Sequence, residues 1–186
     1  MDKIKPIKTE RKLKSLPSYS EVSNVLNTIE NIKHYVIVLT LISTGIRMSE
    51  LLDIRLCDID SSKQRILIRN GKGGKSRFVS LNSFVLDKLK LYYRIHKPKY
   101  YLFEGDNGKY TSSSVNKFIK KHFGQEYHAH LFRHVYITYM IEQDVNVNRL
   151  KLMTGHKSER TLNFYYQYTD NSIENEINPV NELILN

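Results

Sequence analysis

The sequence has little or none of three things: cysteine, tryptophan and long apolar runs. Its 186 residues include one cysteine, Cys57, and no tryptophan. A single cysteine excludes an internal disulfide framework and is typical of a reducing compartment. The longest apolar run, Tyr35 to Ile42, is interrupted by Thr40 and is far too short to span a bilayer. The lysines near the N-terminus are not followed by an apolar run, so no signal peptide is expected. We therefore expect a cytoplasmic protein that does not enter a membrane.

Acidic residues are also scarce over most of the chain. Residues 1–160 hold all 29 Lys and Arg but only 15 of the 19 Asp and Glu, and the formal net charge is +10. Basic residues cluster in residues 1–14 and in residues 61–81, and the second cluster contains no acid. The last 26 residues carry four acids and no Lys or Arg. A basic body with an acidic tail favours a polyanionic partner.

Length and composition indicate one soluble domain. A chain of 186 residues can bury one core but is too short for two, and its 40% hydrophobic and 26% charged residues are typical of a globular protein. Residues 1–17 are expected to form a basic lead, residues 18–169 the folded domain, and residues 170–186 an acidic C-terminal tail.

Periodicity predicts a mainly α protein with a small antiparallel β-sheet. The capping box Ser18-x-x-Glu21 opens the first helix. Two strand-like segments, residues 65–69 and 77–81, flank the glycine-rich residues 70–75 and predict a hairpin. The helix over residues 83–96 is expected to turn Val85, Leu86, Leu89 and Tyr93 inward. Further helices are predicted over residues 35–43, 47–54, 112–122, 130–143, 146–154 and 160–168.

The segment His130-Leu131-Phe132-Arg133-His134 has the residues for a phosphate site. On a helix, His130 and Arg133 share one face, so a titratable ring and a planar guanidinium point to the same place. Such a pair suits a single phosphate group. A zinc site formed by His122, His128 and His130 is an alternative, but no cysteine or tight carboxylate cluster completes four ligands.

Three other segments carry candidate site residues. Arg47 follows the helix stop Thr44-Gly45, and Glu50 lies one turn later, where it can hold the guanidinium or form a simple surface ion pair. The hairpin tip presents Lys72 and Lys75 on a glycine-rich loop, which lacks the spacing of a P-loop and can also be read as a solvated turn. Gly155-His156 precedes a tyrosine-rich segment.

Taken together, these segments resemble the catalytic domain of the tyrosine recombinases, the phage integrase family. The resemblance runs from about Leu16 to Tyr168 and rests on five motifs in family order. It places the catalytic residues at Arg47, Lys72, His130, Arg133, His156 and Tyr165, with Glu50 and Lys75 in support.

The resemblance implies a fold and a reaction. The fold is the tyrosine recombinase catalytic domain, and Tyr165 would attack a DNA phosphate to form a 3′-phosphotyrosyl link. Arg47 and Arg133 would clamp the phosphate, and Lys72 would protonate the leaving oxygen. His130 would act as general base or proton relay, and His156 would donate to the phosphate. No cofactor, metal or nucleotide is implied. The implied partners are double-stranded DNA and further copies of the chain, as dimers to tetramers on DNA, with the tail docking in trans.

Further expectations concern DNA contacts and other possible functions. DNA contacts are expected at Lys12, Lys14, Arg69 and Arg77. The N-terminal clamp domain that family members usually carry is absent from these residues. Alternatives are a type IB topoisomerase-like enzyme, a non-catalytic DNA-binding regulator, and a metal-dependent nuclease that would use Asp53, Asp58 and Asp60. Tyr166 and Tyr168 compete with Tyr165 as the nucleophile.

Overall fold

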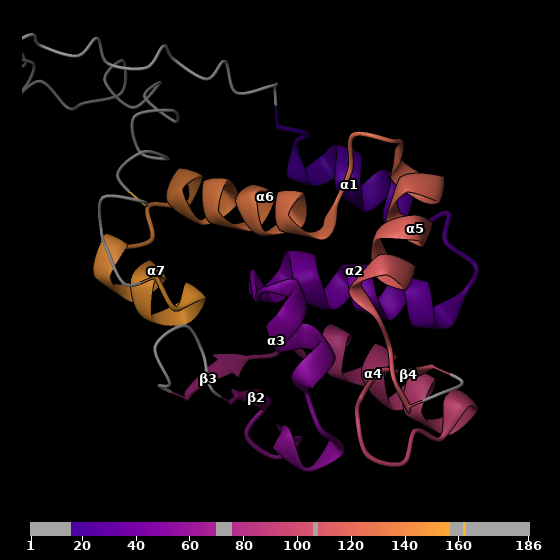
Figure 1. Cartoon of the computed structure of the whole chain (residues 1–186). Coiled ribbons are helices and arrows are strands. Elements are labelled where there is room, and N and C mark those ends of the chain that lie inside the picture. Colours follow the sequence, from indigo (N-terminus) through magenta and orange to yellow (C-terminus); the bar gives the residue numbers. More distant parts are fainter. Residues whose placement is uncertain (1–15, 70–75, 106–107, 157–161, 163–186) are drawn as a thin grey trace, which may run out of the picture.

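The computed structural model describes residues 16–69, 76–105, 108–156 and 162. These residues form a mainly helical body with a small antiparallel sheet at one side, as predicted (Figure 1). The helices are α1 Tyr19–Leu26, α2 Ile32–Thr44, α3 Met48–Asp53, α4 Ser83–His96, α5 Ser112–Phe123, α6 Ala129–Glu142 and α7 Val147–Thr154. The strands are β1 Ile59–Asp60, β2 Arg65–Ile68, β3 Arg77–Ser80, β4 Glu104–Gly105 and β5 Gly108–Lys109.

The helices begin where the sequence supplies capping side chains. At α1, the Ser18 hydroxyl accepts from the Glu21 N–H at 3.2 Å, and the Glu21 carboxylate accepts from the Ser18 N–H at 2.7 Å. This reciprocal pair satisfies two donors that a helix N-terminus leaves open. Asn31, Asn82 and Thr111 cap α2, α4 and α5 in the simpler way, through one side-chain oxygen.

Helix α2 is the centre of the core. Every residue from Val36 to Ile42 is buried, so the helix is apolar around its whole circumference. A helix of this kind must be covered on all sides. Helices α1 and α6 cover one side of α2 and α4 covers the other (Figure 1).

Gly45 ends α2 in a left-handed conformation, with φ of +61°. A Cβ atom there would lie 2.2 Å from the Tyr136 ring on α6, so a side chain is excluded by space as well as by backbone strain. The close approach brings the start of α3 against α6. Because Arg47 caps α3 and Arg133 lies on α6, this turn brings two of the predicted site segments together.

The main sheet has the order β1-β2-β3 and is antiparallel throughout. Ile66 pairs with Val79 and Ile68 with Arg77, which confirms the predicted hairpin. Strand β1 was not predicted, because two residues carry no usable periodicity. A second, very small sheet is formed by β4 and β5.

The prediction that Tyr93 faces the core is wrong. Tyr93 is 50% exposed, whereas its neighbour Tyr92 is 1% exposed. The buried face of α4 continues from Leu89 by three residues rather than four, and the Tyr92 ring then packs against Phe103 at 5.4 Å between centroids. Helix α2 also begins earlier than predicted, at Ile32. Among the described helices, none is long and apolar enough to cross a membrane.

Candidate functional site

Arg47 lies where α2 turns into α3. Its backbone N–H donates to Glu50 Oε2 and its Nη1 donates to Glu50 Oε1, both at 2.9 Å. Glu50 therefore binds the backbone N–H of the N-cap residue Arg47 and also its guanidinium. The contact between these two residues is the one that their spacing predicted.

A second arginine, Arg77, also binds the carboxylate of Glu50. Arg77, on β3, forms a two-pronged ion pair with Glu50 through Nη1 at 2.9 Å and Nη2 at 2.8 Å. The carboxylate is 7% exposed, so burial raises its pKa, but bonds from Arg77 and Arg47 outweigh that effect and lower the pKa of Glu50 to about 2. Glu50 is thus a buried anion that fixes two cations.

Arg133 lies on α6 with only 1% of its surface exposed. Its Nη1 donates to the carbonyl of Gly45 at 2.6 Å, and its Nη2 donates to the carbonyl of Thr154 at 2.8 Å. A buried guanidinium requires acceptors for its donors. Here backbone carbonyls supply them, one from the turn after α2 and one from the end of α7.

The C-terminal end of α7 joins the three arginines. The carbonyl of Met153 accepts from Arg77 at 3.1 Å, that of Thr154 from Arg133, and that of Gly155 from Arg47 at 3.0 Å. The last carbonyls of a helix have no partner within the helix and carry its partial negative charge. Three consecutive carbonyls therefore hold three guanidinium groups that come from three separate segments of the chain.

His156 follows directly and is fixed by Thr154. The Thr154 hydroxyl donates to the carbonyl of Leu150 at 2.6 Å, so it accepts from His156 Nδ1, which lies 2.7 Å away. Nε2 is then the acceptor and lies 3.1 Å from Arg133 Nη2. Burial and the charges of Arg133 and Arg47 lower the pKa of His156 to about 3, so the ring is neutral at pH 7.

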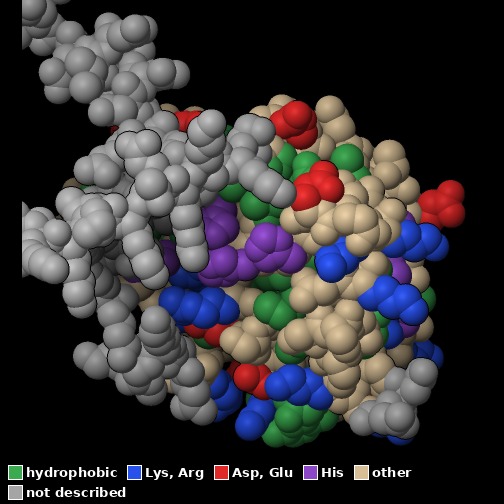
Figure 2. Space-filling model, turned by 45° about the horizontal axis from the view of Figure 1, so that its top comes forward, with side chains coloured by type: hydrophobic (Ala, Val, Ile, Leu, Met, Phe, Trp, Pro, Cys, Tyr) green, Lys and Arg blue, Asp and Glu red, His purple; other side chains and the backbone are tan. Residues whose placement is uncertain are grey.

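His130 occupies the first turn of α6 and is exposed at the surface. Desolvation and the nearby charges of Arg133 and Arg47 lower its pKa. Its ring lies 4.5 Å from that of His134 in an edge-to-face arrangement, and burial followed by the charge of His130 lowers the pKa of His134 to about 4. Figure 2 shows His side chains gathered in the middle of one face, beside Lys and Arg side chains.

The structure therefore brings together Arg47, Glu50, His130, Arg133 and His156, all of which were predicted as site residues. The other predicted residues Lys12, Lys14, Lys72, Lys75 and Tyr165 lie outside the described residues. Arg69 is exposed and bound to the buried carboxylate of Asp58 at 2.6 Å.

Sequence reasoning missed the inward direction of Arg77, which was expected on the surface. A signal was available: Arg77 and Val79 are two residues apart on a strand, so they share a face, and Val79 belongs to the core. The role of the α7 carbonyls had no signal in the sequence, because any residue type supplies a carbonyl.

The three acids considered for a metal-dependent nuclease are separated and partnered. Asp53 binds Lys109, Asp58 binds Arg69, and Asp60 binds Arg65. In the described parts of the chain, no group of three or more His, Cys, Asp or Glu is arranged to hold a metal ion. The ring of His122 lies 5.8 Å from that of His34, between centroids.

This arrangement can bind a phosphate group. Arg47, with 22% of its side chain exposed, and the surface residue His130 are accessible to a ligand. Buried acceptors fix the positions of Arg77 and Arg133. Donors that are already oriented stabilise developing negative charge without reorganising during the reaction.

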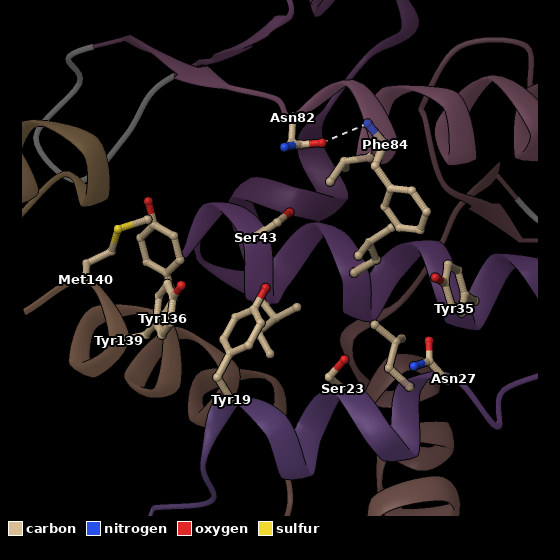
Figure 3. Close-up of a pocket in the computed structure, with 14 residues that line it drawn as sticks. Tyr19, Ser23, Asn27, Tyr35, Ser43, Asn82, Phe84, Tyr136, Tyr139 and Met140 are labelled. Carbon is tan, nitrogen blue, oxygen red and sulfur yellow. Dashed lines mark hydrogen bonds between the residues drawn. The ribbon is translucent and has the colours of Figure 1, made fainter. Parts of the chain in front are cut away.

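A separate groove opens among α1, α2, α4 and α6, with a volume of about 510 Å³. The rings of Tyr19 on α1 and Tyr139 on α6 stack at 4.7 Å between centroids, and Tyr136 also lines the groove from α6 (Figure 3). Leu39 and the half-exposed Phe84 form apolar parts of its wall. Its lining is neutral and largely apolar, which distinguishes it from the cluster of Arg47, Arg77 and Arg133 at the end of α7, called the arginine cluster below.

Comparison with known proteins gives a consistent result. The sequence model of the phage integrase family matches residues 18–172. A tyrosine recombinase of Thermosipho africanus is 28% identical over 178 residues, and the tyrosine recombinase XerA of Pyrococcus horikoshii is 26% identical over 184 residues. The aligned regions cover 91% and 95% of this chain, but only 63% and 65% of those relatives. The chain thus spans less than two thirds of their length.

Solved structures share the fold. A crystal structure of XerA recombinase superimposes with a TM-score of 0.77 at 23% identity, over 92% of this chain and 65% of that one. The XerH recombinase bound to its difH substrate before cleavage superimposes with a TM-score of 0.73 at 22% identity, over 83% of this chain and 51% of that one.

Proposed function

Because the chain belongs to the phage integrase family, we propose that it is a site-specific DNA recombinase, which cuts and rejoins double-stranded DNA. The observation that carries the proposal is the meeting of Arg47, Arg133 and His156 at one end of α7. Relatives named tyrosine recombinase and a structural neighbour bound to its DNA substrate support it.

The proposed reaction is a phosphoryl transfer to Tyr165. Its phenolate oxygen attacks the phosphorus, the bond to the 5′-oxygen breaks, and a 3′-phosphotyrosyl link and a free 5′-hydroxyl result. Free tyrosine has a pKa of about 10, so its proton must be removed, and His130 is the proposed base. Lys72 is the proposed acid for the 5′-oxygen, with Lys75 in support. The link retains the energy of the phosphodiester, so religation needs no metal or nucleotide.

The arginine cluster suits the charge that develops. Arg47 is the more exposed of the two proposed clamps, while Arg133 is buried and held by carbonyls. A phosphate anion near Arg133 would favour the charged form of His156 and raise its pKa. His156 can then donate to a phosphate oxygen, although in the DNA-free protein its Nε2 accepts from Arg133.

DNA binding is proposed to extend over the basic surface beyond this site. Lys12, Lys14 and Arg69 are the proposed backbone contacts, and the positive charge of residues 1–160 supplies the attraction. Each phosphate that the protein neutralises steepens the dependence of affinity on salt. DNA affinity should therefore fall strongly as the salt concentration rises.

The test is covalent capture from a library of random duplexes, each with one nick. A nick downstream of a cleavage site lets the short 5′-hydroxyl fragment leave, so the protein stays attached to the DNA. Adducts are separated on a denaturing gel, their DNA is sequenced, and the linked peptide is mapped by mass spectrometry. The expected result is an adduct on Tyr165 with a shared DNA sequence, and no adduct with Tyr165→Phe.

The controls separate the alternatives. An adduct on Tyr166 or Tyr168 would move the nucleophile but keep the mechanism. An adduct without any shared DNA sequence, with relaxation of supercoiled plasmid, would favour a type IB topoisomerase-like enzyme. Binding without adduct would favour a DNA-binding regulator, and cleavage that EDTA abolishes would favour a metal-dependent nuclease.

We also propose that the enzyme assembles on DNA as dimers to tetramers, with residues 170–186 docking on a neighbouring subunit. That segment carries Ile173, Ile177, Leu183 and Leu185 among its acids. The groove in Figure 3 offers an apolar surface of matching character. The groove is neutral, so it does not attract the acidic tail by charge, and burial of apolar side chains would supply most of the binding energy.

Deletion of residues 170–186 should leave the binding of single sites intact and impair the formation of higher complexes, measured by gel shift and light scattering. Phe84→Ser, in the groove wall, should have the same effect. Ile95→Ser is the matched control, because Ile95 lies on the same helix, is 57% exposed and is not part of the groove. Unchanged assembly in the deletion would contradict tail docking, and an effect of the deletion alone would place the docking surface elsewhere.

A further inference from the structure

Arg77 lies two residues after residues 70–75, the loop that carries Lys72, yet its side chain points into the protein. Only 13% of it is exposed, and all three of its described contacts are internal. Nη1 and Nη2 bind Glu50, and Nε donates to the carbonyl of Met153. A guanidinium engaged in this way has few donors left for DNA.

The contact between Arg77 and Glu50 also affects the position of Arg47. A carboxylate has about four sites for hydrogen bonds, and here Arg77 takes two while the backbone and side chain of Arg47 take the other two. A two-pronged pair between Arg77 and Glu50 fixes the plane of the carboxylate as well as its place. The direction of the Arg47 guanidinium therefore depends on Arg77.

The contact between Arg77 and the carbonyl of Met153 affects the position of His156. It anchors the last turn of α7, whose next two carbonyls hold Arg133 and Arg47. Gly155 lies directly against Arg77: a Cβ atom there would be 2.9 Å from Arg77 Nη1, and the φ of Gly155 is +67°. The glycine before His156 is thus required by the position of Arg77 as well as by the backbone turn.

We propose that Arg77 is a positioning residue of the phosphate site, which orients Arg47 through Glu50 and His156 through the end of α7. The inference rests on the proposed function, because it assigns these two residues to one phosphate. Arg77 also ties β3, and with it one arm of the loop that carries Lys72, to the arginine cluster. It does this without contacting DNA, in contrast to the surface role that its sequence position suggested.

The test compares Arg77→Gln and Arg77→Lys with the control Arg65→Gln. Arg65 lies on β2 of the same sheet and loses a carboxylate partner of its own, Asp60, when substituted. For each variant, DNA affinity is measured over a range of salt, the single-turnover rate of adduct formation is measured at saturating protein, and the melting temperature is recorded.

Arg77→Gln should keep the DNA affinity and its salt slope and should lower the adduct rate by about 100-fold or more, the typical effect of misplacing a reacting group by about 1 Å. Arg77→Lys should recover part of the rate, because an ammonium group keeps the charge but cannot form the planar pair. Arg65→Gln should match the parent. Glu50→Gln and the double variant Glu50→Gln/Arg77→Gln complete the set: the double variant should lose less rate than the product of the two single losses, because Arg77 acts on Arg47 through Glu50.

A salt slope that falls by about one in Arg77→Gln, with weaker binding, would mean a direct phosphate contact and would overturn the inference. An unchanged adduct rate would also overturn it. If Arg77→Gln does not fold, the adduct rate and the salt slope of Arg77→Lys are compared with those of the parent instead. Absence of an adduct in the parent protein would instead contradict the proposed function, and the salt slopes would still decide whether Arg77 contacts DNA.

Discussion

Two regions of this molecule use arginine in opposite ways. At the end of α7, Arg47, Arg77 and Arg133 share buried acceptors, and one carboxylate serves two of them. On β1 and β2, Arg65 pairs with a single aspartate near the surface, Asp60, and the two side chains are 32% and 30% exposed. Buried charged groups without partners cost several kcal/mol, whereas exposed ion pairs contribute little. Removing a charged side chain should therefore lower the stability strongly in the first region and only slightly in the second.

Arg133→Ala should have the largest effect on stability. It removes the donors of two buried carbonyls, those of Gly45 and Thr154, and leaves a cavity beside His156. An unsatisfied buried acceptor costs about 1–3 kcal/mol, so we expect a loss of about 3 kcal/mol in the free energy of unfolding. Urea denaturation measures it. A loss below about 1 kcal/mol would mean that the cluster rearranges freely.

The cluster should also make the protein sensitive to acid. His156 has a pKa of about 3 in the folded protein, whereas an unfolded histidine has a pKa of about 6.5. Between these values the unfolded chain binds a proton that the folded protein does not, so stability falls as the pH falls from about 6.5 toward 3. Glu50, with a folded pKa of about 2, adds a further loss below pH 4.5.

Denaturant titrations at several pH values test this. His156→Gln should reduce the slope of stability against pH between pH 6 and 4 by on the order of one proton. The exposed His128 provides the control: His128→Gln should leave that slope close to that of the parent. Equal slopes in all three proteins would contradict a depressed pKa at His156.

The comparison also shows what the sequence can reveal. Helix starts such as that at Ser18, the stop at Gly45 and the hairpin were predictable because capping and turn residues act locally. The pairing of Arg47 with Glu50 was predictable for the same reason, since the residues are one turn apart. The position of Arg77 depends on contacts with residues 27 and 76 positions away, which no local pattern encodes. Tyr165 and Lys72 lie outside the described residues, so their roles stay predictions.

The smallest effect is expected at Asp53, in the surface class of ion pairs. Its carboxylate binds Lys109, but 56% of the Asp53 side chain and 39% of that of Lys109 are exposed. Asp53 is also the last residue of α3, where the negative end of a helix disfavours an acid and offsets part of the gain. Asp53→Asn should therefore change the free energy of unfolding by less than about 0.5 kcal/mol. A double-mutant cycle with Lys109→Gln measures the pair directly. A coupling above about 1 kcal/mol would place this pair with the buried cluster and remove the distinction between the two regions.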